Sequence, residues 1–452
     1  MQHLSESAGA VFAVLAEAGD ATRPRLAQLA GLSKPTVSSA VAELESAGLA
    51  SRTGTTSGTT GRSAAVYRIG PAAGTVLAVD LGSTHTAVRA CTLDGTVVAS
   101  HTARDRELPA ETVRGALWGL AREELGPVRG VVVAVPDVVR PGGGAGDGGG
   151  AGAASGRGAA GRRGAAGGHG AAGGRGGASG HGAGLRNDDR TAPASGSATG
   201  PAPGASHASG TRSWGASHAS DTHAWGARPA TPSIAAAVDA LALPSHLPVH
   251  IENNVNCAAL AELHEGAAKG RHTFGYLQVG YGIGLGIVVG GQVLRGAGGA
   301  AGEIARLPYP WLPGRESVLE GMEAYVGAGA LMRRVREGWT EGRVPEGAAE
   351  LFALAGNGHE AAARFVAGHA REVGRLAAAA VAVLDPGLIV LGGGIGANPQ
   401  LLPGVRAELA RLSWPTEVVG SEVGGDATVA GAARLAVARG IQTVTEGSDK
   451  RH

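Results

Sequence analysis

The sequence predicts an α/β protein built from two parts: a small helix-turn-helix unit with a two-stranded wing, and a larger domain of alternating strands and helices. Three observations predict this organisation. Apolar residues recur at helical spacing on both sides of the Gly31-Leu32-Ser33 turn, strand patterns in the order βββαβ begin at Thr75, and strands and helices return over about 231–442. A stretch rich in glycine and alanine over 141–230 separates the two groups of strands.

Residues 1–70 form the first predicted unit, a winged helix-turn-helix. A helix over about 8–18 is expected to support two further helices in the stretch 25–49. Ser33 is expected to cap the second of these, because its hydroxyl can accept a hydrogen bond from a free amide of the first turn. The side chains expected to face inward from that helix are Val37, Val41 and Leu44.

The N-terminal end of this second helix is a candidate DNA-contacting surface. A helix that enters the major groove presents its N-terminal residues to base edges, and short hydroxyl side chains beside one cation suit that role. The alternative is an ordinary helical hairpin whose serines and threonines are solvated, but helices, turn and cap agree in register, which favours the DNA-binding interpretation. The candidate DNA-binding residues are Ser33, Lys34, Pro35, Thr36, Ser38 and Ser39.

A two-stranded wing is predicted after Gly48, where apolar residues flank a turn region of glycine and threonine. Arg62, in Thr60-Gly61-Arg62, is expected at the tip of this wing, from which it could enter a minor groove. A solvated loop arginine is the alternative at this position.

The larger domain begins with a predicted lobe over 74–140. Its first strand ends in Asp80, a turn of small residues follows, and the order of elements is βββαβ. An acidic residue at the end of the first strand in this order suggests a ribonuclease-H-like nucleotide-binding lobe. Residues 231–442 are expected to complete the domain, and 443–452 to form a polar tail.

The stretch 141–230 is expected to be a disordered insertion. It consists largely of Gly, Ala, Ser, Arg and His, and it has too little apolar content to offset the entropy of ordering it. Such an insertion can interrupt a lobe without unfolding it, because loop closure costs only about 0.6 kcal/mol per doubling of length. Its arginines could touch nucleic acid and its histidines could bind metal, but compositional drift is the better account.

Composition excludes several classes of protein. The formal net charge of the 452 residues is +1 and the isoelectric point is near 8.0, so DNA binding must come from a local surface. Cys91 and Cys257 form neither a disulfide framework nor a cysteine metal site. No apolar run approaches the roughly 20 residues of a membrane span, and the amino terminus lacks an export signal. The sequence therefore predicts a soluble, cytoplasmic protein without a membrane partner.

Five motifs then resemble the ROK family (repressor, open reading frame, kinase), and specifically its winged-helix transcriptional regulators. They lie in the family's order after the helix-turn-helix: AVDLGSTHTAVRA and VGYGIGLGIVVGG resemble the two phosphate motifs, IENNVNCAALAE the sugar and catalytic motif, AGEIAR the sugar-binding motif, and IVLGGGIG the nucleotide-side turn. The resemblance implies an actin-like ATPase/sugar kinase fold of two ribonuclease-H-like lobes.

Two departures from the family pattern argue against phosphoryl transfer. Family members that phosphorylate sugars carry Glu-Asn-Asp, in which the aspartate takes the proton of the sugar hydroxyl, whereas this chain has Asn254 in that place. An amide cannot accept that proton, and losing a general base typically costs about 10²- to 10⁴-fold in rate. Tyr281 also replaces the small hydroxyl residue of the second phosphate motif. We therefore expect no enzymatic activity and no cofactor.

The family's zinc site is not expected either. The resemblance aligns Arg306 with the zinc-binding histidine, and Trp311, Pro313 and Val318 with the three cysteines. None of these side chains coordinates zinc. Packing is expected to hold this loop instead.

The residues that remain of the sugar pocket suggest an effector site. The resemblance assigns sugar hydroxyl contacts to Asn253, Glu303 and Glu320. Arg306 beside them suggests an anionic or phosphorylated sugar, since a guanidinium can bind phosphate through two hydrogen bonds. The alternative is a vestigial pocket in which Arg306 pairs with a neighbouring carboxylate. The candidate effector-binding residues are Asn253, Asn254, Glu303, Arg306 and Glu320.

The favoured hypothesis is a sequence-specific regulator, most simply a repressor of carbohydrate uptake or use. It would bind a double-stranded DNA operator as a homodimer or a dimer of dimers and respond to a sugar or sugar phosphate. Two alternatives are a sugar kinase with an added DNA-binding domain, and a ligand-independent DNA-binding protein whose large domain only dimerises.

Overall fold

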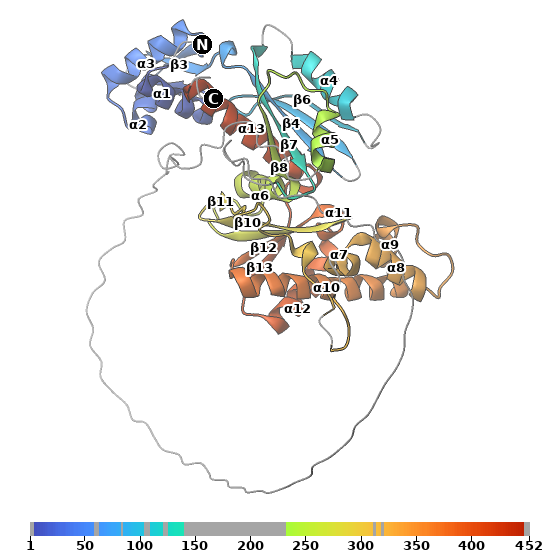
Figure 1. Cartoon of the computed structure of the whole chain (residues 1–452). Helices are drawn as coiled ribbons and strands as arrows, with labels where there is room; N and C mark the ends of the chain where they lie inside the picture. Colours follow the sequence, from blue (N-terminus) through green and yellow to red (C-terminus); the bar gives the residue numbers. More distant parts are fainter. Residues whose placement is uncertain are drawn as a thin grey trace, which may run out of the picture. The chain divides into compact units, whose positions relative to one another are not determined.

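The computed structural model describes residues 4–57, 63–82, 85–103, 109–120, 125–139, 232–310, 313–317 and 321–446 (Figure 1). The expected insertion over 141–230 lies outside these residues. So do four single residues discussed above: Arg62, Trp311, Val318 and Glu320.

The N-terminal unit is a winged helix-turn-helix, as predicted. Its elements are α1 (Glu6–Ala18), β1 (Ala21–Thr22), α2 (Arg23–Ala30), α3 (Lys34–Ser46), β2 (Ala50–Ser57) and β3 (Ser63–Ile69). The three strands form one sheet in the order β1-β3-β2. α1 begins two residues earlier than expected, because Ser5 caps it by accepting a hydrogen bond from the amide of Ala8 at 3.2 Å.

The first lobe is a five-stranded sheet in the order β6-β5-β4-β7-β8, with β4–β6 antiparallel and β4, β7 and β8 parallel. Alternate residues of its central strand face opposite layers, as strand geometry requires. Leu77 and Val79 share a core with Val113 of α4, and Val76 and Ala78 share another with α13. The elements are β4 (Thr75–Leu81), β5 (Thr86–Thr92), β6 (Val97–Ala103), α4 (Pro109–Leu120), β7 (Val128–Val135), α5 (Pro232–Asp239) and β8 (Val249–Asn253).

The second lobe repeats this plan in the sheet order β11-β10-β9-β12-β13, with β9–β11 antiparallel and β9, β12 and β13 parallel. Its strands are β9 (Phe274–Val279), β10 (Ile283–Val289), β11 (Gln292–Val293), β12 (Leu388–Gly392) and β13 (Glu417–Gly420). Its helices are α7 (Gly321–Val326), α8 (Ala328–Gly338), α9 (Ala348–Gly356), α10 (Glu360–Leu384), α11 (Gly393–Gly396) and α12 (Leu402–Leu412). The two lobes confirm the predicted two-lobed fold.

Two helices, α6 (Asn254–Glu265) and α13 (Ala427–Glu446), pack against each other where the lobes meet. A Cβ atom at Gly431 would lie 1.7 Å from the carbonyl oxygen of Cys257, so only glycine allows this approach. α13 is longer than expected: the sequence predicts a helix over 427–439, and the helix continues to Glu446. Residues 443–446, expected to belong to a polar tail, are therefore helical, and Val444 is buried.

Within the part of the chain described above, no helix has the length and apolar character needed to cross a bilayer. Cys91 and Cys257 are both buried free thiols.

Candidate functional site

The N-terminal end of α3 has the local structure that the sequence predicts. Ser33 has extended backbone angles and accepts a hydrogen bond from the amide of Thr36 at 3.3 Å. The two hydroxyls of this pair lie 2.8 Å apart. The inward-facing residues are Val37, Ala40, Val41 and Leu44, all of which are buried.

The other side chains at this end of α3 face outward. Ser33, Lys34, Pro35, Ser38 and Ser39 are exposed, and Thr36 is half-buried beneath its bond to Ser33. The arrangement places one cation and several hydroxyls at the exposed start of a capped helix, which suits contacts with base edges and phosphates. DNA contact by these residues stays a prediction.

Ion pairs divide the remaining charges of the winged helix into two groups. Arg68 forms two hydrogen bonds of 2.9 Å to Asp20, and Arg23 pairs with Glu45 at 3.5 Å. Such cations are neutralised within the domain. The cations without a carboxylate partner among the described residues are Arg25, Lys34 and Arg52, and Arg25 instead donates to Gln28 at 2.9 Å.

Two of the candidate effector residues, Asn253 and Asn254, lie where β8 ends and α6 begins. Asn253 caps α6: its Oδ1 accepts from the amides of Val255 at 2.8 Å and Asn256 at 3.2 Å. Its Nδ2 donates to the carbonyl of Asp137 at 3.1 Å. The side chain expected to bond a sugar is thus mainly occupied with backbone groups, and one Nδ2 proton is left for a ligand.

Asn254 is the first residue of α6 and is half-buried. No hydrogen bond joins its side chain to the described residues, so its amide is available for a hydroxyl. Its neighbour Glu252 is instead buried and accepts from Arg295 Nε at 2.8 Å and from Asn256 Nδ2 at 3.0 Å.

The carboxylate of Glu252 stays charged in spite of its burial. Burial alone would raise its pKa, but His250, the guanidinium of Arg295 and the amide of Asn256 together outweigh burial and lower the pKa to about 2. Because Arg295 follows β11 in the second lobe and Glu252 lies on β8 in the first, this ion pair joins the lobes beside the candidate site. Sequence reasoning missed Arg295 and Asn256, since neither spacing nor composition marks them.

Glu303 precedes the 3-10 turn Ile304–Arg306, and Arg306 is the last residue of that turn. Burial raises the pKa of the Glu303 carboxyl, the charge of Arg306 opposes this rise, and the carboxylates of Asp137 and Glu323 add to it. One guanidinium therefore shares this region with three carboxylates. Glu323 accepts from the amide of Ile283 at 3.3 Å, which fixes it beneath the turn that carries Tyr281.

The residues at the family's zinc positions do not fit a zinc ion. Arg306 occupies the position of the histidine and Pro313 that of a cysteine, and neither donates to zinc. In the described ranges, no group of three His, Cys, Asp or Glu side chains could hold a metal ion.

The phosphate-side motifs are also modified. Asp80 is buried at the end of β4 and lies 3.1 Å from His85 Nε2; burial raises the pKa of Asp80, and the bond to His85 opposes this effect. Tyr281 is 73% exposed in the turn between β9 and β10. Gly393, in the glycine turn after β12, is required, because a Cβ there would lie 2.7 Å from the carbonyl oxygen of Val279.

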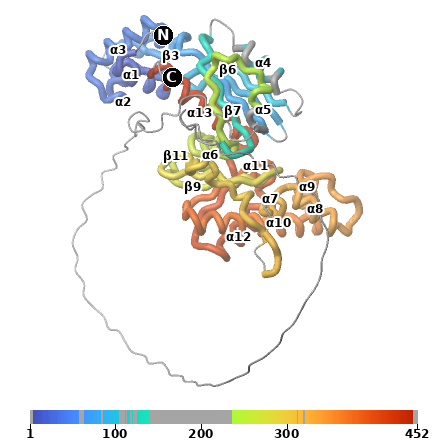
Figure 2. Tube along the Cα trace, in the orientation of Figure 1, coloured from blue at the N-terminus to red at the C-terminus, as the bar shows by residue number. Residues whose placement is uncertain are grey.

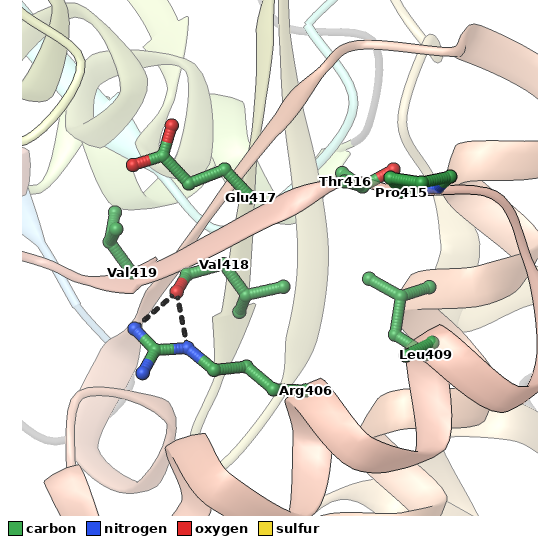
Figure 3. A pocket seen from close by; sticks show the side chains of 8 residues that line it. Arg406, Leu409, Pro415, Thr416, Glu417, Val418 and Val419 are labelled. Carbon is green, nitrogen blue, oxygen red and sulfur yellow. Dashed lines mark hydrogen bonds between the residues drawn. The ribbon is translucent and has the colours of Figure 1, made fainter.

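A cavity of about 560 Å³ lies elsewhere, between α12 and the edge strand β13 (Figure 3). Arg406 donates to the carbonyl of Val418 through both Nε, at 2.8 Å, and Nη2, at 2.6 Å. None of the candidate effector residues lines it. Its simplest role is structural, because Arg406 satisfies a carbonyl on the open edge of the sheet.

Comparisons with known proteins agree with this geometry. A model described as the ROK family matches residues 236–439, and one described as the MarR family matches residues 4–63. A glucokinase of Thermotoga maritima is 30% identical over 220 residues, which are 44% of this chain and 68% of that protein. The bifunctional enzyme NanE/NanK of Brucella melitensis is 32% identical over 191 residues, which are 42% of this chain.

The chain covers only 35% of the length of that bifunctional enzyme. One solved structure is described as a ROK family transcriptional regulator homologous to the Escherichia coli MLC protein. It aligns with a TM-score of 0.62 and 18% identity over 97% of this chain and 98% of its own. This likeness shows that both parts of the fold occur together in another protein.

Proposed function

Because this chain belongs to the ROK family and begins with a winged helix of MarR type, we propose that it is a sequence-specific transcriptional regulator. The observation that carries the proposal is the start of α3, a capped helix whose outward residues are a cation and hydroxyls. As a homodimer, it would place two such helices in successive major grooves of a palindromic operator. Repression of genes for carbohydrate uptake or use is the simplest role.

Selection of duplexes from a random pool by the full chain tests this proposal. Recovery of a palindromic sequence is expected, and failure to enrich any sequence would overturn it. Lys34→Ala should weaken binding to all duplexes and reduce the salt slope by about 1, because one phosphate contact is lost. Lys269→Ala is the matched control, since Lys269 is also exposed but lies in the body.

Base preference should depend on different residues of α3. Thr36→Ala and Ser39→Ala should relax the preference at single positions of the selected sequence, by about 1–3 kcal/mol per base pair. If Lys34→Ala, Thr36→Ala and Ser39→Ala all kept the affinity and preference of the parent, the assignment of α3 as recognition helix would be wrong.

For the effector, we propose an uncharged sugar bound near Asn254 and Glu303. The Glu303 carboxyl lies near one guanidinium, that of Arg306, and near two further carboxylates, those of Asp137 and Glu323, so a sugar phosphate is the less favourable ligand. Isothermal titration should give heat with a neutral hexose or N-acetylhexosamine and weaker or no heat with its 6-phosphate. Glu303→Gln should weaken binding, and Glu316→Gln, an exposed glutamate of the same loop, should not. Tighter binding of the phosphate would favour an anionic effector, and no heat with any sugar would favour a vestigial pocket.

Kinase activity is the second candidate, because curated relatives include a glucokinase and an N-acetylmannosamine kinase. Asn254 and Tyr281 argue against it, since the first cannot act as a base and the second stands where a small hydroxyl is expected. A coupled assay of ADP release with glucose and N-acetylmannosamine should show no turnover. The same assay on Asn254→Asp tests whether a general base is the only group that the chain lacks for phosphoryl transfer.

A further inference from the structure

The short segment that joins the winged helix to the body, residues 70–74, is hydrogen-bonded on both sides. We call it the connector. Towards the winged helix, the amide of Gly70 donates to Leu49 at 2.8 Å and that of Ala72 donates to Gly48 at 3.2 Å. Towards the body, the amide of Thr75 donates to the carbonyl of Pro127 at 3.0 Å. Backbone hydrogen bonds therefore tie the connector to the winged helix, and tie the residue that follows it to the body.

Arg129, on β7 of the body, holds the same segment. Its Nε donates to the carbonyl of Ala73 at 2.7 Å, and its Nη2 donates to the carbonyl of Ala72. The guanidinium therefore satisfies two consecutive carbonyls at the end of the connector's 3-10 turn, Pro71–Ala73. Such carbonyls would otherwise need water if the segment were a free hinge.

The backbones on the two sides also lie against each other. A Cβ at Gly74 would lie 2.1 Å from the carbonyl oxygen of Pro127, and one at Gly126 would lie 1.9 Å from that of Pro71. Both glycines also have positive φ, which other residues rarely adopt. The close approach therefore requires glycine both for its small size and for its backbone conformation. No space is left for the connector to swing.

A second contact lies between α1 and the last turns of α13 (Figure 2). Gly9 faces Thr445, and Val444 belongs to the same buried cluster as Ala8, Val11 and Phe12. The cluster continues into the sheet of the first lobe through Val76. The winged helix is therefore packed on the body at a place that is separate from the connector in the sequence.

We propose that Arg129 and the end of α13 are positioning residues that set the spacing of the two operator half-sites. The inference rests on the proposed function. If each winged helix is fixed on its body, the distance between the two recognition helices is set by the dimer and not by the DNA. A flexible tether would instead let each winged helix follow half-sites at different spacings.

The fixed docking can be measured without DNA. Spin labels at introduced cysteines, Ser39→Cys on α3 and Ser100→Cys on β6, report the distance between winged helix and body, with unlabelled protein added to suppress distances between subunits. The parent should give one narrow distribution. Arg129→Met should broaden it, and Arg406→Met should not, because Arg406 also donates twice to a carbonyl but lies in the second lobe. A broad distribution in the parent would overturn the inference.

The effect on DNA is measured with the selected palindrome and with versions whose half-sites are moved apart by 1 to 5 base pairs. The parent should lose about 100-fold in affinity when one half-site is misplaced, because half of the specific contacts are lost. Arg129→Met should show a much smaller loss. Affinity for a single half-site should stay that of the parent, which a merely unfolded winged helix would not allow.

A second pair of variants acts on the other contact. A Cβ at Gly9 would lie 3.5 Å from Thr445 Cβ, which is ordinary contact, so Gly9→Ala should keep the parent's spacing preference. Gly9→Leu is too large for the space and should reduce that preference. If Arg129→Met and Gly9→Leu both kept the parent's spacing preference and narrow distribution, the inference would be wrong. If the parent enriched no DNA but gave the narrow distribution, only the proposed function would fail.

Discussion

The residues at the start of α6 are held in place by hydrogen bonds within the motif and from other elements. The side chain of Asn253 forms hydrogen bonds with three backbone groups. The buried carboxylate of Glu252 accepts hydrogen bonds from Arg295 and Asn256. The sequence motif identifies which residues lie here, because it places Glu, Asn and Asn between a strand and a helix. It does not reveal that Asn253 is chiefly a cap, since that depends on the loop of Asp137 arriving from another strand.

Because of the ion pair of Glu252, the free energy of unfolding should depend on pH in the acid range. Its pKa is lowered from 4.5 to about 2 in the folded state. A lowered folded-state pKa contributes stability that is present above about pH 4.5 and lost as the pH falls towards 2. That contribution is about 3 kcal/mol, from the size of the shift. Glu252→Gln should therefore lower the unfolding free energy at pH 7 and flatten its fall below pH 4.5 in urea titrations.

The control for this prediction is Glu417→Gln. Glu417 pairs with Arg271, but both side chains are about half exposed, 50% and 49%. An exposed pair is worth about 0–1 kcal/mol, so this variant should hardly change either quantity. Equal losses in the two variants would show that burial does not set the value of the Glu252 pair.

At the scale of elements, the crossing of α6 and α13 decides how the two lobes are joined. The sequence predicts both helices from their spacing, but not that they meet, because the residues in contact are small and unremarkable in pattern. Gly431 is the key position: its missing side chain lets the carbonyl of Cys257 approach. Helix propensity alone would make glycine a poor choice there, so packing has overridden propensity.

Gly431→Ala should therefore destabilise the protein by about 3 kcal/mol or more, because the added methyl group meets backbone that cannot move aside. Gly368→Ala is the matched control in the middle of α10, where an added Cβ meets only the far end of Arg371 at 3.9 Å. It should stabilise by about 0.5–1 kcal/mol through helix propensity. Thermal unfolding of the two variants and the parent distinguishes the outcomes; similar melting temperatures for both variants would contradict the role of the crossing.

At the scale of the whole molecule, the winged helix and the first lobe share one buried cluster that includes Val444. This continuity depends on the last turns of α13. They carry the sequence Gln442-Thr443-Val444-Thr445-Glu446, whose polar composition suggests a solvated tail. Val444 is buried because α1 packs beside these turns.

Removal of residues 443–452 should loosen the winged helix. We expect faster hydrogen exchange of α1 amides and weaker binding of the selected duplex, because Val444 and Thr445 no longer pack on α1. Removal of 447–452 alone is the control, since it leaves the whole of α13 in place. Unchanged exchange in the longer deletion would show that the connector alone holds the winged helix.

The sequence by itself determined the elements and their order. Helical spacing and the cap at Ser33 predicted the helix α3, and strand patterns predicted the first lobe. Five motifs in order, four of which contain glycine, indicated the family and its two-lobed fold. These features could be predicted because they depend on neighbours within a few residues. Local patterns also located the departures at Asn254 and Tyr281.

Only the tertiary structure decided which distant groups meet. Residues from separate elements meet in the hydrogen bonds to Glu252, in the carboxylates near Glu303, in the hydrogen bonds of Arg129 to the connector and in the burial of Val444. Such contacts depend on where the chain returns, and no local periodicity carries that information. For this reason the sequence indicated a candidate DNA-binding helix and candidate effector residues, while the carboxylates near Glu303 and the contacts between the winged helix and the first lobe emerged only from the fold.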